Sequence, residues 1–176
     1  DNPGAPVTEA DVETRVENLI ASNIGARGNN AAAEEAPAPA IAASRSIVLD
    51  NSTDRILYSK NSYSKAPMAS TTKIMTFLIA VENCEDLYET VTVSRVAAYT
   101  EGSSMHLAEG ETISLHDLLY GLLLNSGNDA AVAIAEHIGG SVEGFAEKMN
   151  EKAKELGCKD THFVTPNGLD LSLIHI

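Results

Sequence analysis

The sequence predicts an α+β fold, because two strand-like segments come before a series of helical ones. Ser46–Asp50 and Arg55–Ser59 are short apolar strands on either side of the polar turn 51–54, a pattern typical of a β-hairpin with a four-residue loop. Beyond residue 70, apolar side chains recur at helical spacing instead. Strands followed by helices, without alternation, are the arrangement on which the predicted fold class rests.

Two helices are predicted in the first part of the helical region. The run Ile74–Val81 is apolar nearly all round, which indicates a helix buried inside the domain. The next helix begins at a capping box formed by Ser114 and Asp117 and ends near Asn125. Its apolar face consists of Leu115, Leu118, Leu119, Leu122 and Leu123.

A further apolar helix is predicted over Ala130–Ile138. Asn128 and Asp129 are residues that can cap its start, and the pair Gly139-Gly140 closes it. A short polar turn therefore lies between two buried helices.

The remaining composition is that of an acidic chain with a distinct N-terminal segment. The 25 acidic and 12 basic residues give a net charge of −13, which disfavours a nucleic-acid partner. Residues 1–43 are rich in Ala, Asn, Gly and Pro and predict a flexible tether, in which Thr8–Ile24 has the pattern of a possible short helix. Because the sequence shows no leader and no run of eighteen apolar residues, we expect neither a signal peptide nor a membrane span within it.

Ser70 and Lys73 form a Ser-x-x-Lys pattern at the start of the first apolar helix. Residues three apart share one face of a helix, so the hydroxyl and the amine can meet there. The helix start favours a serine alkoxide and burial lowers the pKa of a lysine, so a neutral Lys73 could act as general base for a Ser70 nucleophile. The alternative is a serine cap beside a solvated lysine. A second such pattern, Ser62–Lys65, lies in a polar stretch before Pro67, and we assign it to a solvated loop.

The polar turn between the two later helices is Ser126-Gly127-Asn128. Ser, Gly and Asn are the residues expected in an ordinary interhelical turn, and that is one interpretation. The other is that the turn projects a hydroxyl and a carboxamide into a cleft.

Together these elements resemble the penicillin-binding serine D,D-peptidases, and most closely the low-molecular-mass D-alanyl-D-alanine carboxypeptidases. The resemblance runs from about Ala43 to Asp170, and motifs in this number and order are specific. It implies a β-lactamase/transpeptidase-like fold, in which an antiparallel sheet flanked by helices adjoins a mainly helical lobe, with residues 44–170 as the N-terminal part of that domain. The motifs include Arg55–Tyr58, Met68–Thr76, Gly102–Met105, Asp117–Leu123, Ser126–Ala131, Met149–Ala153 and Pro166–Asp170.

The resemblance also implies roles for the candidate site residues. Ser70 would be the acyl-accepting nucleophile, Lys73 its base, and Ser126 a proton relay to the leaving D-alanine. Asn128, with Gly127 beside it in the motif, would bind the substrate, and the Ser70 backbone N–H would form half of an oxyanion hole.

The sequence departs from the family pattern at its end. A third signature, Lys-Thr-Gly or a variant, is absent from the 176 residues, so we expect this chain to lack the later strands, to leave one sheet edge unpaired and to be inactive. We attribute the hexapeptide Leu171–Ile176 to read-through into a sequencing adapter; a natural hydrophobic end strand is the alternative.

The function implied is that of a serine D,D-carboxypeptidase that removes the terminal D-alanine from peptidoglycan stem peptides and is acylated by penicillins. A β-lactamase and a catalytically inert cell-wall-binding fragment are the alternatives. The partners expected are the stem peptide and β-lactam antibiotics, in an extracytoplasmic location, with membrane contact only through a missing C-terminal anchor.

No cofactor and no metal site are predicted. The histidines, at positions 106, 116, 137, 162 and 175, show no metal-ligand spacing, and His137 is better placed as a partner of a helix dipole. Cys84 and Cys158 permit at most one disulfide, and paired free thiols are an equal alternative.

Overall fold

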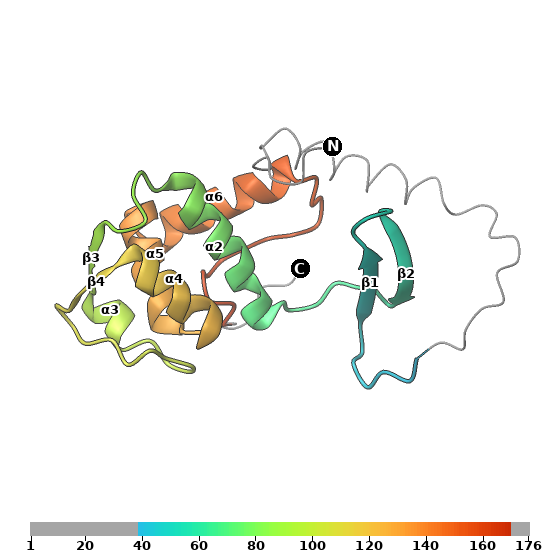
Figure 1. Ribbon diagram of the computed structural model, residues 1–176, viewed down its shortest axis with the longest axis horizontal. Helices are drawn as coiled ribbons and strands as arrows, with labels where there is room; N and C mark the ends of the chain where they lie inside the picture. Colours follow the sequence, from blue (N-terminus) through green and yellow to red (C-terminus); the bar gives the residue numbers. More distant parts are fainter. Residues whose placement is uncertain (1–38, 170–176) are drawn as a thin grey trace, which may run out of the picture. The chain divides into compact units, whose positions relative to one another are not determined.

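The computed structural model describes residues 39–169, in two compact units that divide between Lys65 and Ala66 (Figure 1). Most of the predicted tether, its possible helix over Thr8–Ile24 and the hexapeptide Leu171–Ile176 lie outside the described residues. The first unit contributes a hairpin, and the second contributes the helices.

The hairpin is confirmed. Strand β1 (Ser46–Asp50) pairs antiparallel with β2 (Arg55–Lys60), and Asp50 opposite Arg55 closes the four-residue loop. The Asp50 carboxylate accepts hydrogen bonds from the Ser52 hydroxyl at 2.6 Å, the Thr53 hydroxyl at 2.6 Å and the Ser52 amide at 2.9 Å. These bonds lower the pKa of Asp50 to about 2, so the ionised carboxylate fixes the turn.

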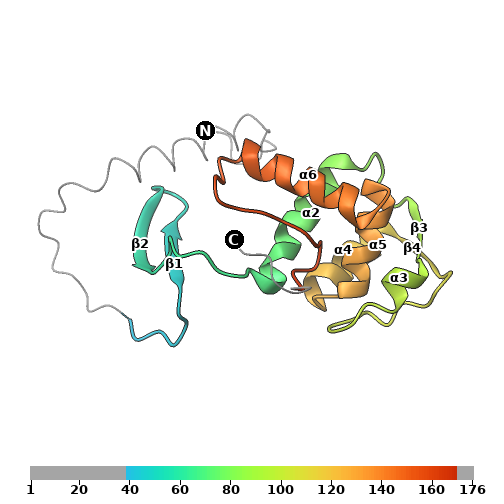
Figure 2. The ribbon, with the colours of Figure 1, turned by 180° about the vertical axis from the view of Figure 1, so that it is seen from behind.

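The second unit is mainly helical (Figures 1 and 2). A 3₁₀ turn, η1, leads directly into α2, and two three-residue strands, β3 and β4, pair antiparallel beside the helices. The central element is α5, which packs against α2, α3, α4 and α6. The bounds are η1 Ala69–Thr71, α2 Thr72–Asn83, β3 Thr90–Thr92, α3 Arg95–Ala98, β4 Thr112–Ser114, α4 Leu115–Leu124, α5 Asn128–Gly139 and α6 Val142–Glu155.

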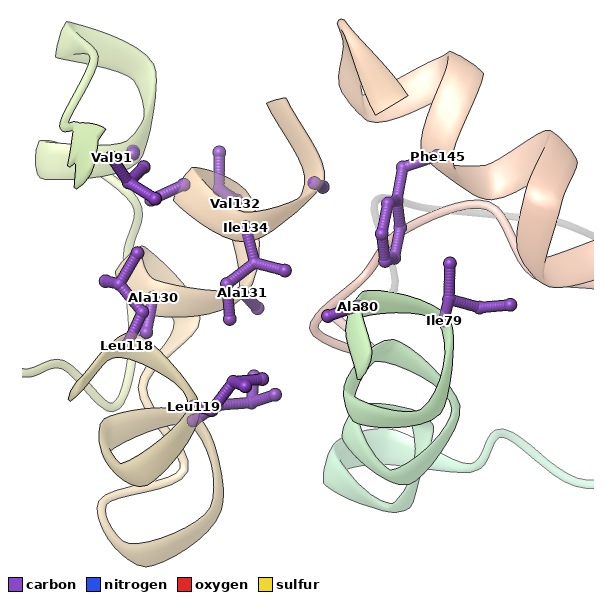
Figure 3. Packing of buried hydrophobic residues seen from close by; sticks show 14 of the residues in the cluster. Ile79, Ala80, Val91, Leu118, Leu119, Ala130, Ala131, Val132, Ile134 and Phe145 are labelled. Carbon is purple, nitrogen blue, oxygen red and sulfur yellow. The ribbon is translucent and has the colours of Figure 1, made fainter. Parts of the chain in front are cut away.

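Helix α5 can be central because most of its buried side chains are small. Alanines let the backbones of neighbouring helices approach closely, while Val132 and Ile134 fill the space that remains. Figure 3 shows side chains of α5 in one cluster with others from α2, α4, α6 and β3. The buried alanines of α5 are Ala130, Ala131, Ala133 and Ala135.

The predicted helix ends are largely confirmed. The Ser114 hydroxyl accepts from the Asp117 amide at 3.1 Å, and Asn125 is the C-cap of α4. Gly140 ends α5 in the left-handed conformation, with φ of 73°. The predicted cap at Asn128 and Asp129 is wrong, because α5 begins at Asn128 with Gly127 as its N-cap. The Asn128 side chain contacts Lys73, and the Asp129 carboxylate accepts from the Met105 amide as well as from the Ala130 amide in the first turn of α5.

The predicted burial of the first helix is also corrected. Ile74 of α2 is 67% exposed, and the buried side of the helix carries Lys73, Thr76 and Ile79. Helices α3 and α6 and the β3–β4 pair were not predicted from the sequence. Two of these begin at serine caps, Ser94 for α3 and Ser141 for α6, each of which accepts from a backbone amide three residues on.

The α4 leucines give a matched test of this packing. Leu122 is 0% exposed and Leu124, two residues on, is 76% exposed. Leu122→Ala leaves a cavity and is expected to lower the free energy of unfolding by about 2–5 kcal/mol. Leu124→Ala is expected to change it by less than about 0.5 kcal/mol. Urea denaturation of both variants measures the difference, and equal losses would contradict the packing described.

Candidate active site

The candidate site is built around the amine of Lys73, at the start of α2. Ser70 lies in the preceding 3₁₀ turn rather than in the helix itself, yet the predicted contact forms: Lys73 Nζ lies 3.2 Å from Ser70 Oγ. The Lys73 side chain is only 2% exposed, whereas Ser70 is exposed. The pair therefore joins an accessible hydroxyl to a buried amine.

The other partners of the Lys73 amine come from two distant segments. Its Nζ lies 2.7 Å from Asn128 Oδ1 and 3.2 Å from both Ser126 Oγ and the Asn167 carbonyl oxygen, all within hydrogen-bond distance. These three oxygens and Ser70 Oγ are all neutral, and none of the ion pairs among residues 39–169 includes Lys73, so no carboxylate of that range offsets the cost of burying an ammonium ion. Burial accordingly lowers the pKa of Lys73 below its ordinary value of 10.5.

Ser126 completes a triangle with Ser70 and Lys73. Its hydroxyl donates to Ser70 Oγ at 3.0 Å and accepts from the Lys73 amine. The Ser126 backbone has φ of 53°, a left-handed conformation that is costly for a residue other than glycine. The Ser70 hydroxyl thus has both a direct contact to an amine and a second contact through a hydroxyl, which is the arrangement needed to move a proton away from a nucleophile.

The predicted substrate-binding residues, Asn128 and Gly127, lie beside this triangle but are buried. Asn128 uses its oxygen for Lys73, and its Nδ2 donates to the Glu101 carbonyl at 2.8 Å, which leaves one N–H of the amide. The Gly127 amide donates to the Gly121 carbonyl at 3.1 Å. In this structure the side chain of Asn128 fixes Lys73, and its role toward a substrate stays a prediction.

The segment 166–168 was missed as part of the site, because it acts through its backbone. The Asn167 carbonyl contacts Lys73, and the Thr76 hydroxyl of α2 donates to the Pro166 carbonyl at 2.5 Å. Gly168 has φ of 75°, and a Cβ there would lie 1.9 Å from the Ala69 carbonyl oxygen. The Pro-Asn-Gly sequence indicated a turn at this position. A sequence does not reveal, however, which backbone carbonyl faces the Lys73 amine.

The second Ser-x-x-Lys pattern, Ser62–Lys65, follows β2 in the first unit. Ser62 follows β2 in a turn, with its hydroxyl 2.6 Å from that of Ser59, as the assignment to a loop predicts. Cys84 and Cys158 are free thiols.

Within residues 39–169, no three His, Cys, Asp or Glu side chains gather as a metal-binding group. The helices in that range are all too short or too polar to cross a bilayer.

Comparisons with known proteins identify close similarities. A sequence model of the S11 peptidase family, described as D-alanyl-D-alanine carboxypeptidase, matches residues 29–173. The chain is 43% identical over 131 residues to D-alanyl-D-alanine carboxypeptidase DacF of Bacillus subtilis, an alignment that covers 72% of this chain and 34% of DacF.

Solved structures give the same result for the fold. D-alanyl-D-alanine carboxypeptidase DacD from Francisella tularensis superposes with a TM-score of 0.74 at 33% identity, over 85% of this chain and 37% of that one. Penicillin binding protein 6B from Escherichia coli superposes with a TM-score of 0.71 at 35% identity, over 82% of this chain and 49% of that one. The chain spans about a third to a half of the length of these relatives.

The lowered pKa of Lys73 predicts a pH dependence of stability. At a pH where the folded chain holds a neutral amine, the unfolded chain still binds the proton, so the free energy of unfolding rises with pH up to 10.5. Lys73→Met removes this contribution. Urea unfolding of both proteins at several pH values is expected to show the extra rise in the wild type alone. Parallel curves would contradict a neutral Lys73.

Glycine at position 168 gives a second test. Gly168→Ala must displace either the Asn167–Leu169 backbone or Ala69, whereas a Cβ at Gly110, with a similar φ of 79°, meets nothing within 4 Å. Gly110→Ala is expected to cost about 1 kcal/mol from backbone strain alone, and Gly168→Ala at least about 1 kcal/mol more. Thermal unfolding measures the stability of both variants. Equal losses of stability would show that the close approach of Gly168 to Ala69 does not add to the cost of the substitution.

Proposed function

Because the chain belongs to the S11 peptidase family of D-alanyl-D-alanine carboxypeptidases, we propose that its site is that of a serine D,D-carboxypeptidase. The substrate is a peptidoglycan stem peptide ending in two D-alanines, and the location is extracytoplasmic. The single observation that carries the proposal is the buried Lys73 amine, held among neutral oxygens at 3.2 Å from an exposed Ser70 hydroxyl.

Acylation follows from this geometry. Ser70 Oγ attacks the carbonyl carbon between the two terminal D-alanines while its proton passes to the Lys73 nitrogen, either directly or through Ser126. The carbon–nitrogen bond breaks, and the departing amine of D-alanine takes a proton from Ser126, which Lys73 resupplies. The product is an ester of Ser70.

Deacylation regenerates the site. Water attacks the ester carbonyl, gives its proton to the neutral Lys73 amine and releases the shortened peptide as Ser70 regains its hydrogen. The Ser70 backbone N–H is one donor to the oxyanion in both steps. Asn128 has one remaining Nδ2 hydrogen for the substrate's peptide carbonyl, with Gly127 as its neighbour in the turn.

Penicillins fit the same chemistry. When Ser70 opens the β-lactam ring, the amine that is released stays covalently attached to the acyl group and cannot depart from the acyl-enzyme. The likeness to penicillin binding protein 6B supports β-lactams as ligands. A β-lactamase is less well supported, since the family and the relatives named above are carboxypeptidases or penicillin-binding proteins.

Fluorescent penicillin tests the proposal. The sequence contains no Lys-Thr-Gly signature, so labelling is measured on this chain and on the product of the whole gene. We expect a stable adduct on Ser70 in the gene product and little on the 176-residue chain. Ser70→Ala is expected to abolish the adduct, and the matched control Ser62→Ala to leave it intact.

Other outcomes of this labelling would overturn the proposal in distinct ways. Rapid turnover of the drug would identify a β-lactamase. Absence of any adduct on the gene product would indicate a non-catalytic wall-binding protein, and an adduct that survives Ser70→Ala would place the nucleophile elsewhere.

A further inference from the structure

Asp129 is a buried carboxylate that the proposed mechanism does not use. It is 0% exposed, and the described ion pairs do not include it. Burial raises its pKa, but the hydrogen bonds it accepts outweigh burial and leave the pKa below its ordinary value. Asp129 is therefore ionised and is held by hydrogen-bond donors alone.

Those donors lie mostly in one segment, residues 101–107, which we call the strap. The carboxylate accepts from the Ser104 hydroxyl at 2.6 Å, from the Met105 amide at 2.9 and 3.0 Å and from the Leu107 amide at 3.2 Å. The Ala130 amide of α5 supplies a further bond at 2.9 Å. One side chain at the start of α5 thus fixes the second half of the strap.

The first half of the strap contacts the site. The Ser103 carbonyl accepts from the Asn128 amide at 2.7 Å, and the Ser103 hydroxyl donates to the Ser126 carbonyl. The Glu101 carbonyl accepts from Asn128 Nδ2 at 2.8 Å. The strap therefore holds both the backbone and the side chain of Asn128, and the backbone of Ser126.

The strap has little structure of its own to keep it there. It contains no helix or strand, and two of its residues have positive φ, Gly102 at 97° and His106 at 63°. Ser126 is also left-handed, a conformation that persists only where surrounding contacts enforce it. The carboxylate bonds of Asp129 are the strap's strongest attachment, because hydrogen bonds to a charged group exceed those between neutral groups.

We infer that Asp129 is a positioning residue, which anchors the strap and through it holds Ser126 and Asn128 in register with Lys73. The inference deepens the proposed function and rests on it for its catalytic consequence. Its structural part, that the strap depends on Asp129 and the strap in turn fixes Asn128, stands on contacts alone.

Ser104→Ala tests the structural part with a mild change, because it removes one donor to Asp129 and leaves the carboxylate. Ser94→Ala is a closely matched control: the Ser94 hydroxyl also donates to a carboxylate at 2.6 Å, that of Glu136, and also accepts from a backbone amide. Ser104 has the same pair of contacts, to Asp129 at 2.6 Å and from the His106 amide. The two variants differ in whether the hydroxyl supports the strap.

Amide hydrogen exchange of Asn128, relative to Phe145 in α6, is the readout. Phe145 donates to Ser141 within another helix and reports general stability. We expect Ser104→Ala to speed exchange at Asn128 by at least about tenfold relative to Phe145, and Ser94→Ala to leave the ratio unchanged. If exchange of both amides were accelerated by the same factor in Ser104→Ala, Asp129 would contribute only to general stability, and the inference would be overturned.

The catalytic part is tested with fluorescent penicillin on the product of the whole gene. Asp129→Asn and Ser104→Ala are expected to lower the acylation rate constant about tenfold while most molecules still become labelled, since a positioning fault slows each site. A purely structural fault would lower the labelled fraction and leave the rate constant unchanged. If wild type forms no adduct, the proposed function fails while the exchange result still decides the role of Asp129.

Discussion

Burial of one amine among neutral oxygens is the constraint on which the rest of the site depends. Lys73 Nζ is contacted by Ser70, Ser126, Asn128 and Asn167, which belong to three separate stretches of the chain. No carboxylate of residues 39–169 pairs with this amine, so its described surroundings favour the uncharged form. The same contacts therefore orient the amine and favour the uncharged form that can accept a proton.

In the second unit, the packed helices fix the framework, and single polar side chains hold the irregular segments of the site. Alanine-rich α5 packs closely against its neighbours and so fixes the position of Asn128, its first residue, where the Ser126-Gly127-Asn128 turn ends. The irregular segments that complete the site are tied by single polar side chains. Thr76 holds the Pro166 carbonyl, and Asn150 of α6 holds the backbone of Phe163 at both its N–H and its carbonyl, at 2.7 Å each. Such main-chain contacts keep non-helical chain in place without a sheet.

Local patterns foretold the parts of the fold that depend on local chemistry. The hairpin loop at Asp50, the cap at Ser114 and the left-handed end at Gly140 each follow from residues within a few positions. The spacing of Ser70 and Lys73 likewise predicted their contact. Tertiary contacts were not predictable in this way. Asn128 contacts Lys73 rather than capping α5, and Ile74 is exposed. The Asn167 carbonyl contacts Lys73, and the Glu101 carbonyl accepts from Asn128. Every residue has the same backbone carbonyl, so a sequence pattern does not show which carbonyl will contact the site.

The charge state of Lys73 can be measured by NMR of its side chain. Lysines labelled with ¹³C at Cε are titrated in the folded chain, and Lys73→Arg assigns the signal by its loss. We expect the Lys73 signal to titrate clearly below the ordinary lysine value of 10.5. An inflection at or above 10.5 would mean that Lys73 is an ammonium ion in the site and would contradict its proposed role as the base for Ser70.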